Sequence, residues 1–228
     1  MNGNHNGNHN GDHHGNRPTG IVLGGGRSSR FGRDKLVEPL GGEPLLWRPI
    51  RALAPVCREI VLVLGPDGPL PPLPPDVASI VRVARDPEPF GGPLVGLAAG
   101  LAVATGRWVV VVAGDQPNLR PGLLGLLAEL IATERASRTG EVADATRAVA
   151  LVDEAGVTRP LPCALDREAA QVAAESLLTS GERRLRALLA ALDVVAIPEA
   201  AWRSVDPDAG WTRDIDLPDD LLRVDPVD

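Results

Sequence analysis

An unbroken apolar run near the middle of the chain restricts the folds that this sequence can adopt. Residues 108–113 read Trp-Val-Val-Val-Val-Ala, with no polar side chain in the run. A half-exposed strand alternates apolar and polar residues, whereas a continuous β-branched run has to be covered on both of its faces. The run therefore predicts a central strand of a sheet that carries helices on both sides.

Shorter apolar segments alternate with longer segments of helical character on both sides of this run. We expect further strands at 20–23, 59–64, 79–83, 148–152, 161–165 and 194–197, and helices at 45–53, 93–104, 119–134, 167–178, 183–192 and 218–222. The proline-rich stretch 65–76 is expected to be a loop. Strands that alternate with helices predict an α/β fold, a three-layer α/β/α sandwich with a Rossmann-like, mostly parallel sheet. Ligands of such sheets bind beyond the carboxyl ends of the strands.

The chain has 228 residues, which is enough for one sizeable α/β domain. Residues 1–17 are mainly Asn, Gly and His and are expected to form a disordered tail, with a single domain at 18–228. All four histidines lie in this tail, at positions 5, 9, 13 and 14. The domain therefore has no histidine, which excludes Ser-His-Asp catalysis, Cys-His catalysis and His-ligated metals.

Composition excludes further classes of protein. A net charge of −7 and an aromatic content of 3% argue against a nucleic-acid-binding surface. No apolar run is long enough to cross a membrane, and no secretory signal is visible. The two distant cysteines, Cys57 and Cys163, are expected to be reduced thiols. We therefore expect a cytoplasmic protein with no nucleic-acid or membrane partner, either a monomer or a weak homo-oligomer.

A single lysine marks the most distinctive loop. Of the 23 basic side chains only Lys35 is a lysine, and it ends the run Leu-Gly-Gly-Gly-Arg-Ser-Ser-Arg-Phe-Gly-Arg-Asp-Lys at 23–35. Glycines let the backbone approach a ligand and direct N–H groups at phosphate oxygens. Lysine adds a compact charge that can follow a moving phosphoryl group. The run thus predicts a phosphate site made by Gly24, Gly25, Gly26 and Lys35.

This run differs from two common nucleotide loops. A P-loop requires Gly-Lys-Ser/Thr after four spacer residues, which the run lacks. A dinucleotide fingerprint requires a third glycine where Ser29 stands, although Gly24 and Gly26 match its start. An oxidoreductase with a dinucleotide fold is therefore disfavoured.

A carboxylate follows the central strand in the sequence Gly-Asp-Gln-Pro at 114–117. At the end of a central strand, Asp115 is well placed to hold Mg²⁺ against phosphates. The alternative is that Asp115 caps the next helix. Pro117 and Pro121 disfavour the cap because they move the start of that helix downstream.

Two further segments carry candidate site residues. Period-two spacing puts Asp214 and Asp216 on one side of an extended segment, where they could complete a metal site. Asp216 could instead cap a short helix near Pro218, and both roles can coexist. The turn at 86–96, which begins with Asp86 and is rich in glycine and proline, could line a nucleobase.

These motifs, taken in order, resemble the signature of the MobA-like nucleotidyltransferases. The resemblance covers residues 19–222 and rests on the segments 25–35, 92–96, 114–117, 159–165, 181–185 and 214–221. It implies a fold of the nucleotide-diphospho-sugar transferase type. Within the family the chain is similar to the guanylyltransferases that join GMP from GTP to molybdopterin, which implies GTP and molybdopterin as substrates and Mg²⁺ as cofactor.

The resemblance also implies roles for individual residues. The nucleotide would be bound by Leu23, Gly24, Gly25, Gly26, Lys35, Asp86 and Asp115. Catalysis would depend on Lys35, Arg30 and Asp115, and the metal on Asp115 and Asp216. Because a phosphate acceptor is already anionic, the reaction needs no general base, which suits a domain without histidine.

One motif departs from the family pattern. The usual Asn-x-Asn-Thr-Pro is Asp-Ile-Asp-Leu-Pro at 214–218, and an Asp pair occurs in relatives that use other acceptors. An Asn found near the base in some members is also absent at 64–65. Three alternatives stay open at this point: transfer from CTP, transfer to another phosphorylated acceptor, and a nucleotide-binding protein without catalysis.

Overall fold

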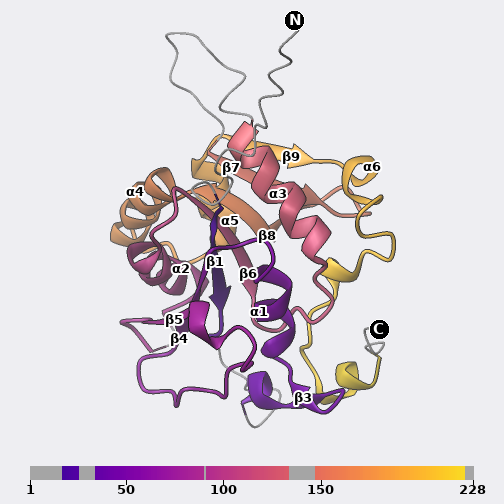
Figure 1. Ribbon diagram of the computed structural model, residues 1–228. Coiled ribbons are helices and arrows are strands. Elements are labelled where there is room, and N and C mark those ends of the chain that lie inside the picture. The colour runs from indigo at the N-terminus through magenta and orange to yellow at the C-terminus, as the bar shows by residue number, and fades with distance from the viewer. Residues whose placement is uncertain (1–16, 26–33, 90, 134–146, 224–228) are drawn as a thin grey trace, which may run out of the picture.

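The computed structural model describes residues 17–25, 34–89, 91–133 and 147–223 (Figure 1). Within these residues, a seven-stranded sheet has the strand order β5-β4-β1-β6-β8-β7-β9. The strands are β1 (Thr19–Leu23), β4 (Glu59–Leu64), β5 (Val81–Arg85), β6 (Trp108–Ala113), β7 (Ala148–Val152), β8 (Thr158–Asp166) and β9 (Val194–Ile197). A small hairpin of β2 (Pro39–Leu40) and β3 (Glu43–Pro44) stands apart from the sheet.

The helices are α1 (Trp47–Leu53), α2 (Pro93–Val103), α3 (Pro121–Thr133), α4 (Arg167–Thr179), α5 (Leu185–Ala191) and α6 (Glu199–Trp202). Four short 3₁₀ segments accompany them in the described residues: η2 (Lys35–Val37), η3 (Ala78–Ile80), η4 (Gly210–Thr212) and η5 (Pro218–Arg223). None of the helices in the described residues is long and apolar enough to span a bilayer.

Strand β6 lies near the centre of the sheet, and its side chains alternate between two cores. Val110 and Val112 pack in the core under α1 and α3, whereas Val109 and Val111 pack in the core under α2, α4 and α5. Figure 1 shows these helices on opposite sides of the sheet. All four valines are fully buried, so the unbroken apolar run is covered on both faces and the predicted three-layer sandwich is confirmed.

The sheet is mostly parallel, as predicted, with β8 as the reversed strand. β1 pairs in parallel with β4 and β6, β4 pairs in parallel with β5, and β7 pairs in parallel with β9. β8 is antiparallel to both β6 and β7 because a tight hairpin joins β7 to β8. In that turn Gly156 adopts a φ of 78°, and the Asp153 carboxylate accepts the N–H groups of Ala155 and Val157.

Some element boundaries differ from those that the sequence predicts. The strand expected at 79–83 lies at Val81–Arg85, because Ala78–Ile80 forms a 3₁₀ turn before it. β8 begins at Thr158 rather than 161, since Thr158 pairs with Val152 across the hairpin. The single turn α6 was not predicted; it is held by tertiary packing of Trp202, which is fully buried.

The carboxyl ends of β1, β4, β5 and β6 point to the same edge of the sheet, because these four strands are parallel. The glycine loop, the proline-rich loop, Asp86 and the turn 114–117 follow those strands directly. The C-terminal segment returns to the same edge, where the Ile215 N–H donates to the Asp115 carbonyl at 3.0 Å. The edge therefore gathers segments from both ends of the sequence.

Candidate active site

The end of β1 lies in a narrow space between β4 and β6. The Gly24 N–H donates to the Val63 carbonyl at 2.8 Å, and the Leu23 carbonyl accepts the Gly114 N–H at 3.0 Å. A Cβ atom on Gly24 would lie 3.1 Å from the Val63 oxygen and 3.2 Å from the Leu62 side chain. The close approach of β4 therefore favours glycine at this point.

Gly25 continues the backbone past the end of the strand and has more room around it. A Cβ atom there would lie 3.7 Å from the Gly65 nitrogen. Gly26 and Arg30, which are also predicted site residues, lie outside the described residues.

Lys35 stands at the start of the 3₁₀ segment η2, directly after Asp34. The Asp34 carboxylate accepts the Leu36 N–H at 3.1 Å and caps this segment, while the Leu36 side chain is buried in the core. These two contacts fix the backbone on either side of Lys35. The lysine side chain is then directed at the edge of the sheet rather than into solvent.

The Lys35 ammonium group joins three parts of the chain. It donates to the Asp115 carboxylate at 2.5 Å and to the Ile215 carbonyl at 2.9 Å, and it lies 3.8 Å from the Asp216 carboxylate. Only 17% of the Lys35 side chain and 21% of the Asp115 side chain are exposed, so the pair is largely shielded from water. The structure thus brings together predicted site residues that lie up to 181 positions apart in sequence.

The turn after β6 holds Asp115. A Cβ atom on Gly114 would lie 3.1 Å from the Leu36 side chain and 3.3 Å from the Leu23 carbonyl, so this position also favours glycine. Helix α3 begins only at Pro121, six residues after Asp115. Asp115 therefore does not cap that helix, and its carboxylate is available to the site.

The segment 214–216 presents two more carboxylates. Ile215 is 1% exposed and packs against Leu40 and Leu45, which leaves Asp214 and Asp216 on the outward side. Although Asp214 as a whole is exposed, desolvation around its carboxyl group, and then the negative charges of Asp115 and Asp216, raise the pKa of Asp214 to about 6.

This donor set suits a hard divalent cation that keeps part of its water. Among the residues that the structure describes, no group of three or more His, Cys, Asp or Glu side chains forms a ready-made metal cage. Mg²⁺ does not need one, because one or two carboxylates together with substrate phosphates usually hold it. Asp115 and Asp216, which both lie within 4 Å of the Lys35 ammonium group, fit that pattern.

Asp86 occupies a different part of the same edge. It follows β5, its N–H donates to the Leu64 carbonyl at 2.8 Å, and its carboxylate accepts the Glu88 N–H at 2.9 Å. Asp86 is 8% exposed, and desolvation raises its pKa despite that hydrogen bond. β4 separates β5 from β1, so Asp86 lies two strands away from the end of β1.

Three features of the site were not predicted from the sequence. The Ile215 carbonyl binds Lys35, and the Gln116 side chain links the Asp115 turn to the C-terminal segment. The Arg183 carbonyl accepts the Leu94 N–H at 3.1 Å at the start of α2, and Gly92 adopts a φ of 96° beside it. Backbone groups and a lone glutamine leave no signal in a single sequence.

Most of the chain matches a known protein family. Residues 20–196 match the model of a family described as the MobA-like NTP transferase domain. A probable molybdenum cofactor guanylyltransferase from Chloroflexus aggregans is 33% identical over 209 residues, which is 90% of this chain and 92% of that protein. A molybdenum cofactor guanylyltransferase from Pseudomonas putida is 33% identical over 172 residues, 74% of this chain and 80% of that protein.

Solved structures show the same fold at lower identity. Molybdopterin-guanine dinucleotide biosynthesis protein A from Archaeoglobus fulgidus has a TM-score of 0.69 and 23% identity, covering 90% of this chain and 95% of that one. A 2-C-methyl-D-erythritol 4-phosphate cytidylyltransferase from Thermus thermophilus has a TM-score of 0.61 and 16% identity, covering 89% and 95%. At these identities the likeness establishes the fold alone.

Proposed function

The chain belongs to the MobA-like NTP transferase family, and on that premise we propose that it transfers GMP from GTP to molybdopterin and releases pyrophosphate. Curated relatives of similar length are molybdenum cofactor guanylyltransferases, and the chain covers most of their sequences. This enzyme works on small phosphorylated substrates. We place it in the cytoplasm as a monomer or weak homo-oligomer.

One observation carries the proposal. Lys35, Asp115 and Asp216 come from three distant parts of the chain and converge beyond the strand ends, where the Gly114 N–H beside Asp115 donates to the Leu23 carbonyl that precedes Gly24. One cation, two carboxylates and a glycine turn are what a site for a metal-bound triphosphate requires. A non-catalytic nucleotide-binding protein would not need a carboxylate and a lysine in direct contact at this point.

Nucleotide binding divides between two places on the edge. Gly25 offers backbone groups to the guanine nucleotide beside Leu23 and Gly24, whose carbonyl and N–H bind Gly114 and Val63, and Lys35 neutralises the phosphates. Asp86, two strands away, binds the nucleoside part. Its low exposure favours this role, because a desolvated carboxylate hydrogen-bonds strongly to ligand hydroxyl or amino groups.

The chemistry is a displacement at the α-phosphorus of GTP. A phosphate oxygen of the acceptor forms the new P–O bond, the bond from the α-phosphorus to the bridging oxygen breaks, and pyrophosphate leaves with the electron pair. The acceptor oxygen is already anionic, so no side chain has to remove a proton. Catalysis then consists of alignment and charge neutralisation, in which Lys35 and Arg30 stabilise charge on the triphosphate.

Asp115, with Asp216, would hold Mg²⁺, which when bound supplies a positive charge against the phosphate oxygens. Both carboxylates also act without it. Asp115 orients the Lys35 ammonium group through their direct contact, and Asp216 adds a second negative group at 3.8 Å. Lys35 is thereby held at the edge of the sheet before substrate arrives.

A panel of nucleotides tests the proposal. Pyrophosphate release is measured with GTP, CTP and ATP in the presence of Mg²⁺, each with and without molybdopterin. We expect release with GTP, dependent on molybdopterin, with a kcat/KM for GTP at least tenfold above that for CTP. Faster pyrophosphate release with CTP than with GTP would show that CTP is the donor. Release with none of the three nucleotides would reject nucleotidyl transfer to molybdopterin.

A further inference from the structure

The glutamine that follows Asp115 is buried and has its amide group engaged on both sides. Gln116 is 3% exposed. Its side-chain oxygen accepts the Ala113 N–H at 3.0 Å, and its side-chain nitrogen donates to the Trp211 carbonyl at 3.1 Å. The Gln116 side chain therefore links the end of β6 to Trp211, which lies 95 positions after Gln116.

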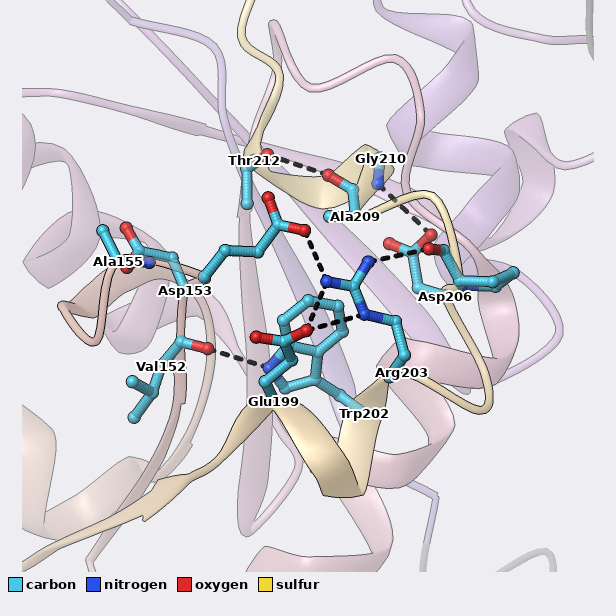
Figure 2. Close-up of polar contacts among 12 residues, drawn as sticks. Val152, Asp153, Ala155, Glu199, Trp202, Arg203, Asp206, Ala209, Gly210 and Thr212 are labelled. Atoms are coloured by element: carbon cyan, nitrogen blue, oxygen red, sulfur yellow. Dashed lines mark hydrogen bonds and ion pairs between the residues drawn. The ribbon is translucent and has the colours of Figure 1, made fainter.

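Trp211 is itself firmly anchored. The Trp211 backbone N–H donates at 3.2 Å to the carboxylate of Asp206, which is fully buried. The Trp211 ring packs edge-on against Trp202, with the ring centroids 5.5 Å apart. Figure 2 shows the neighbouring contacts: the Trp202 indole donates to the Val152 carbonyl, and Arg203 binds Glu199 beside it. The C-terminal segment is thus attached to β7 on one side and to Gln116 on the other.

The next residues of the same segment enter the site. The Ile215 N–H donates to the Asp115 carbonyl at 3.0 Å, and the Ile215 carbonyl accepts from Lys35 at 2.9 Å. The Gln116 amide also interacts with the Asp214 carboxyl group. Within the 114–116 turn, Gln116 is the residue whose side chain binds the segment between Trp211 and Ile215 and holds that segment against the turn.

We propose that Gln116 is a positioning residue that fixes segment 211–216 on the 114–116 turn and so keeps Asp214 and Asp216 beside Asp115. The inference deepens the proposed function and rests on it for its kinetic consequences. Gln116 itself touches no reacting atom. Its effect on turnover passes through the two aspartates and through the carbonyl that orients Lys35.

Two substitutions separate this role from general stability. Gln116→Met keeps the length and apolar bulk of the side chain and removes its hydrogen bonds to Ala113 and Trp211 and its interaction with Asp214. Gln116→Glu keeps the acceptor for the Ala113 N–H but replaces the donor to the Trp211 carbonyl with an oxygen. Thr19→Val is the matched control, because Thr19 is fully buried and bridges Glu59 and the Gly106 N–H at the opposite end of β1.

Amide hydrogen exchange of the nucleotide-free protein is the first readout, and it does not depend on activity. Loss of one or two hydrogen bonds should speed exchange in peptides covering 209–217 by about tenfold in both Gln116 variants, with β1 and residues 108–112 of β6 unchanged. Thr19→Val should leave 209–217 unchanged. Unaltered exchange at 209–217 in Gln116→Met, or an equal increase across residues 108–112, would overturn the proposal.

Kinetics supply the second readout. We expect Gln116→Met to lower kcat about tenfold, with the KM for the nucleotide changed by less than about threefold, because its contacts concern alignment rather than nucleotide binding. In an Asp216→Ala background the same substitution should lower kcat by a smaller factor, because the route through Asp216 is already lost while those through Asp214 and Ile215 remain. Full additivity of the two effects would overturn the route through Asp216.

The two readouts fail separately. If no nucleotide is turned over, the proposed function falls while the exchange result still decides whether Gln116 holds the segment. If turnover is normal in Gln116→Met although 209–217 exchanges faster, Gln116 holds the segment but does not position the site, and the proposal falls while the proposed function stands.

Discussion

Replacing Lys35 with methionine should strengthen the binding of a divalent cation to the nucleotide-free protein. The Lys35 ammonium group lies 2.5 Å from the Asp115 carboxylate, the group that we propose as a metal ligand. A cation that binds Asp115 has to displace this contact or share the carboxylate with it. The lysine thus competes with metal until nucleotide phosphates draw it away.

The size of the effect follows from the contact. Two unit charges about 4 Å apart attract by roughly 4 kcal/mol at an effective dielectric constant of about 20. The Lys35 and Asp115 side chains retain 17% and 21% of their exposure, so solvent and salt reduce that value. We expect a net competition of about 1.4 to 2.8 kcal/mol, which corresponds to a tenfold to hundredfold change in Kd.

Titration of Mn²⁺ into the nucleotide-free proteins, followed by electron paramagnetic resonance, measures this change. Lys35→Met should bind Mn²⁺ at least tenfold more tightly than the unaltered protein. The double variant Lys35→Met/Asp115→Asn is the control and should lose the gain. Equal Mn²⁺ affinity in Lys35→Met and the unaltered protein, with both folded, would refute the competition.

Three further predictions concern turnover and stability. Lys35→Ala and Asp115→Asn should each lower kcat by about two orders of magnitude or more, and Lys35→Arg should restore little, which steady-state pyrophosphate release measures. Desolvation opposes ionisation of Glu59, but hydrogen bonds from Thr105 and Thr19 and the contact with Arg82 outweigh it and lower the pKa of Glu59 from 4.5 to about 2. Glu59 should therefore contribute about 3 kcal/mol to the free energy of unfolding above pH 4.5, and this contribution is lost as the pH falls toward 2. Urea unfolding of the Glu59→Gln variant should lack this part of the pH dependence. Deleting residues 1–16 should leave the melting temperature unchanged, whereas also removing Arg17, which donates to three backbone carbonyls after α1, should lower it by several degrees in a calorimetric scan.

Patterns within one element predicted most of the fold. The run at 108–113 predicted a strand that is buried on both faces, because each of its side chains is apolar. The structure has a hydrophobic core on each face of this strand. The direction of β8 was not predicted, since it depends on the hairpin turn around Gly156. α6 was missed because one helical turn has no periodicity, and burial of Trp202 rather than propensity holds it.

The candidate site was predicted only in part, and for a physical reason. Lys35 and Asp115 could be predicted from the sequence because each is a charged residue in a glycine-containing segment that follows an apolar, strand-like run. The contact of Lys35 with the Ile215 carbonyl, 180 residues away, depends on the path of the C-terminal segment. That path is set by buried partners of Trp211, above all Gln116 and Asp206, and no local pattern encodes such pairings.

Transfer of isotope from GTP to the acceptor tests the central claim most directly. The enzyme is supplied with molybdopterin, Mg²⁺ and GTP labelled with ³²P at either the α- or the γ-phosphorus, and the acceptor product is isolated. The α-label should appear in the molybdopterin product in equal amount to the pyrophosphate released, and the γ-label should appear only in pyrophosphate. Transfer of the γ-label to molybdopterin, or release of pyrophosphate without α-label in the product, would contradict nucleotidyl transfer at this site.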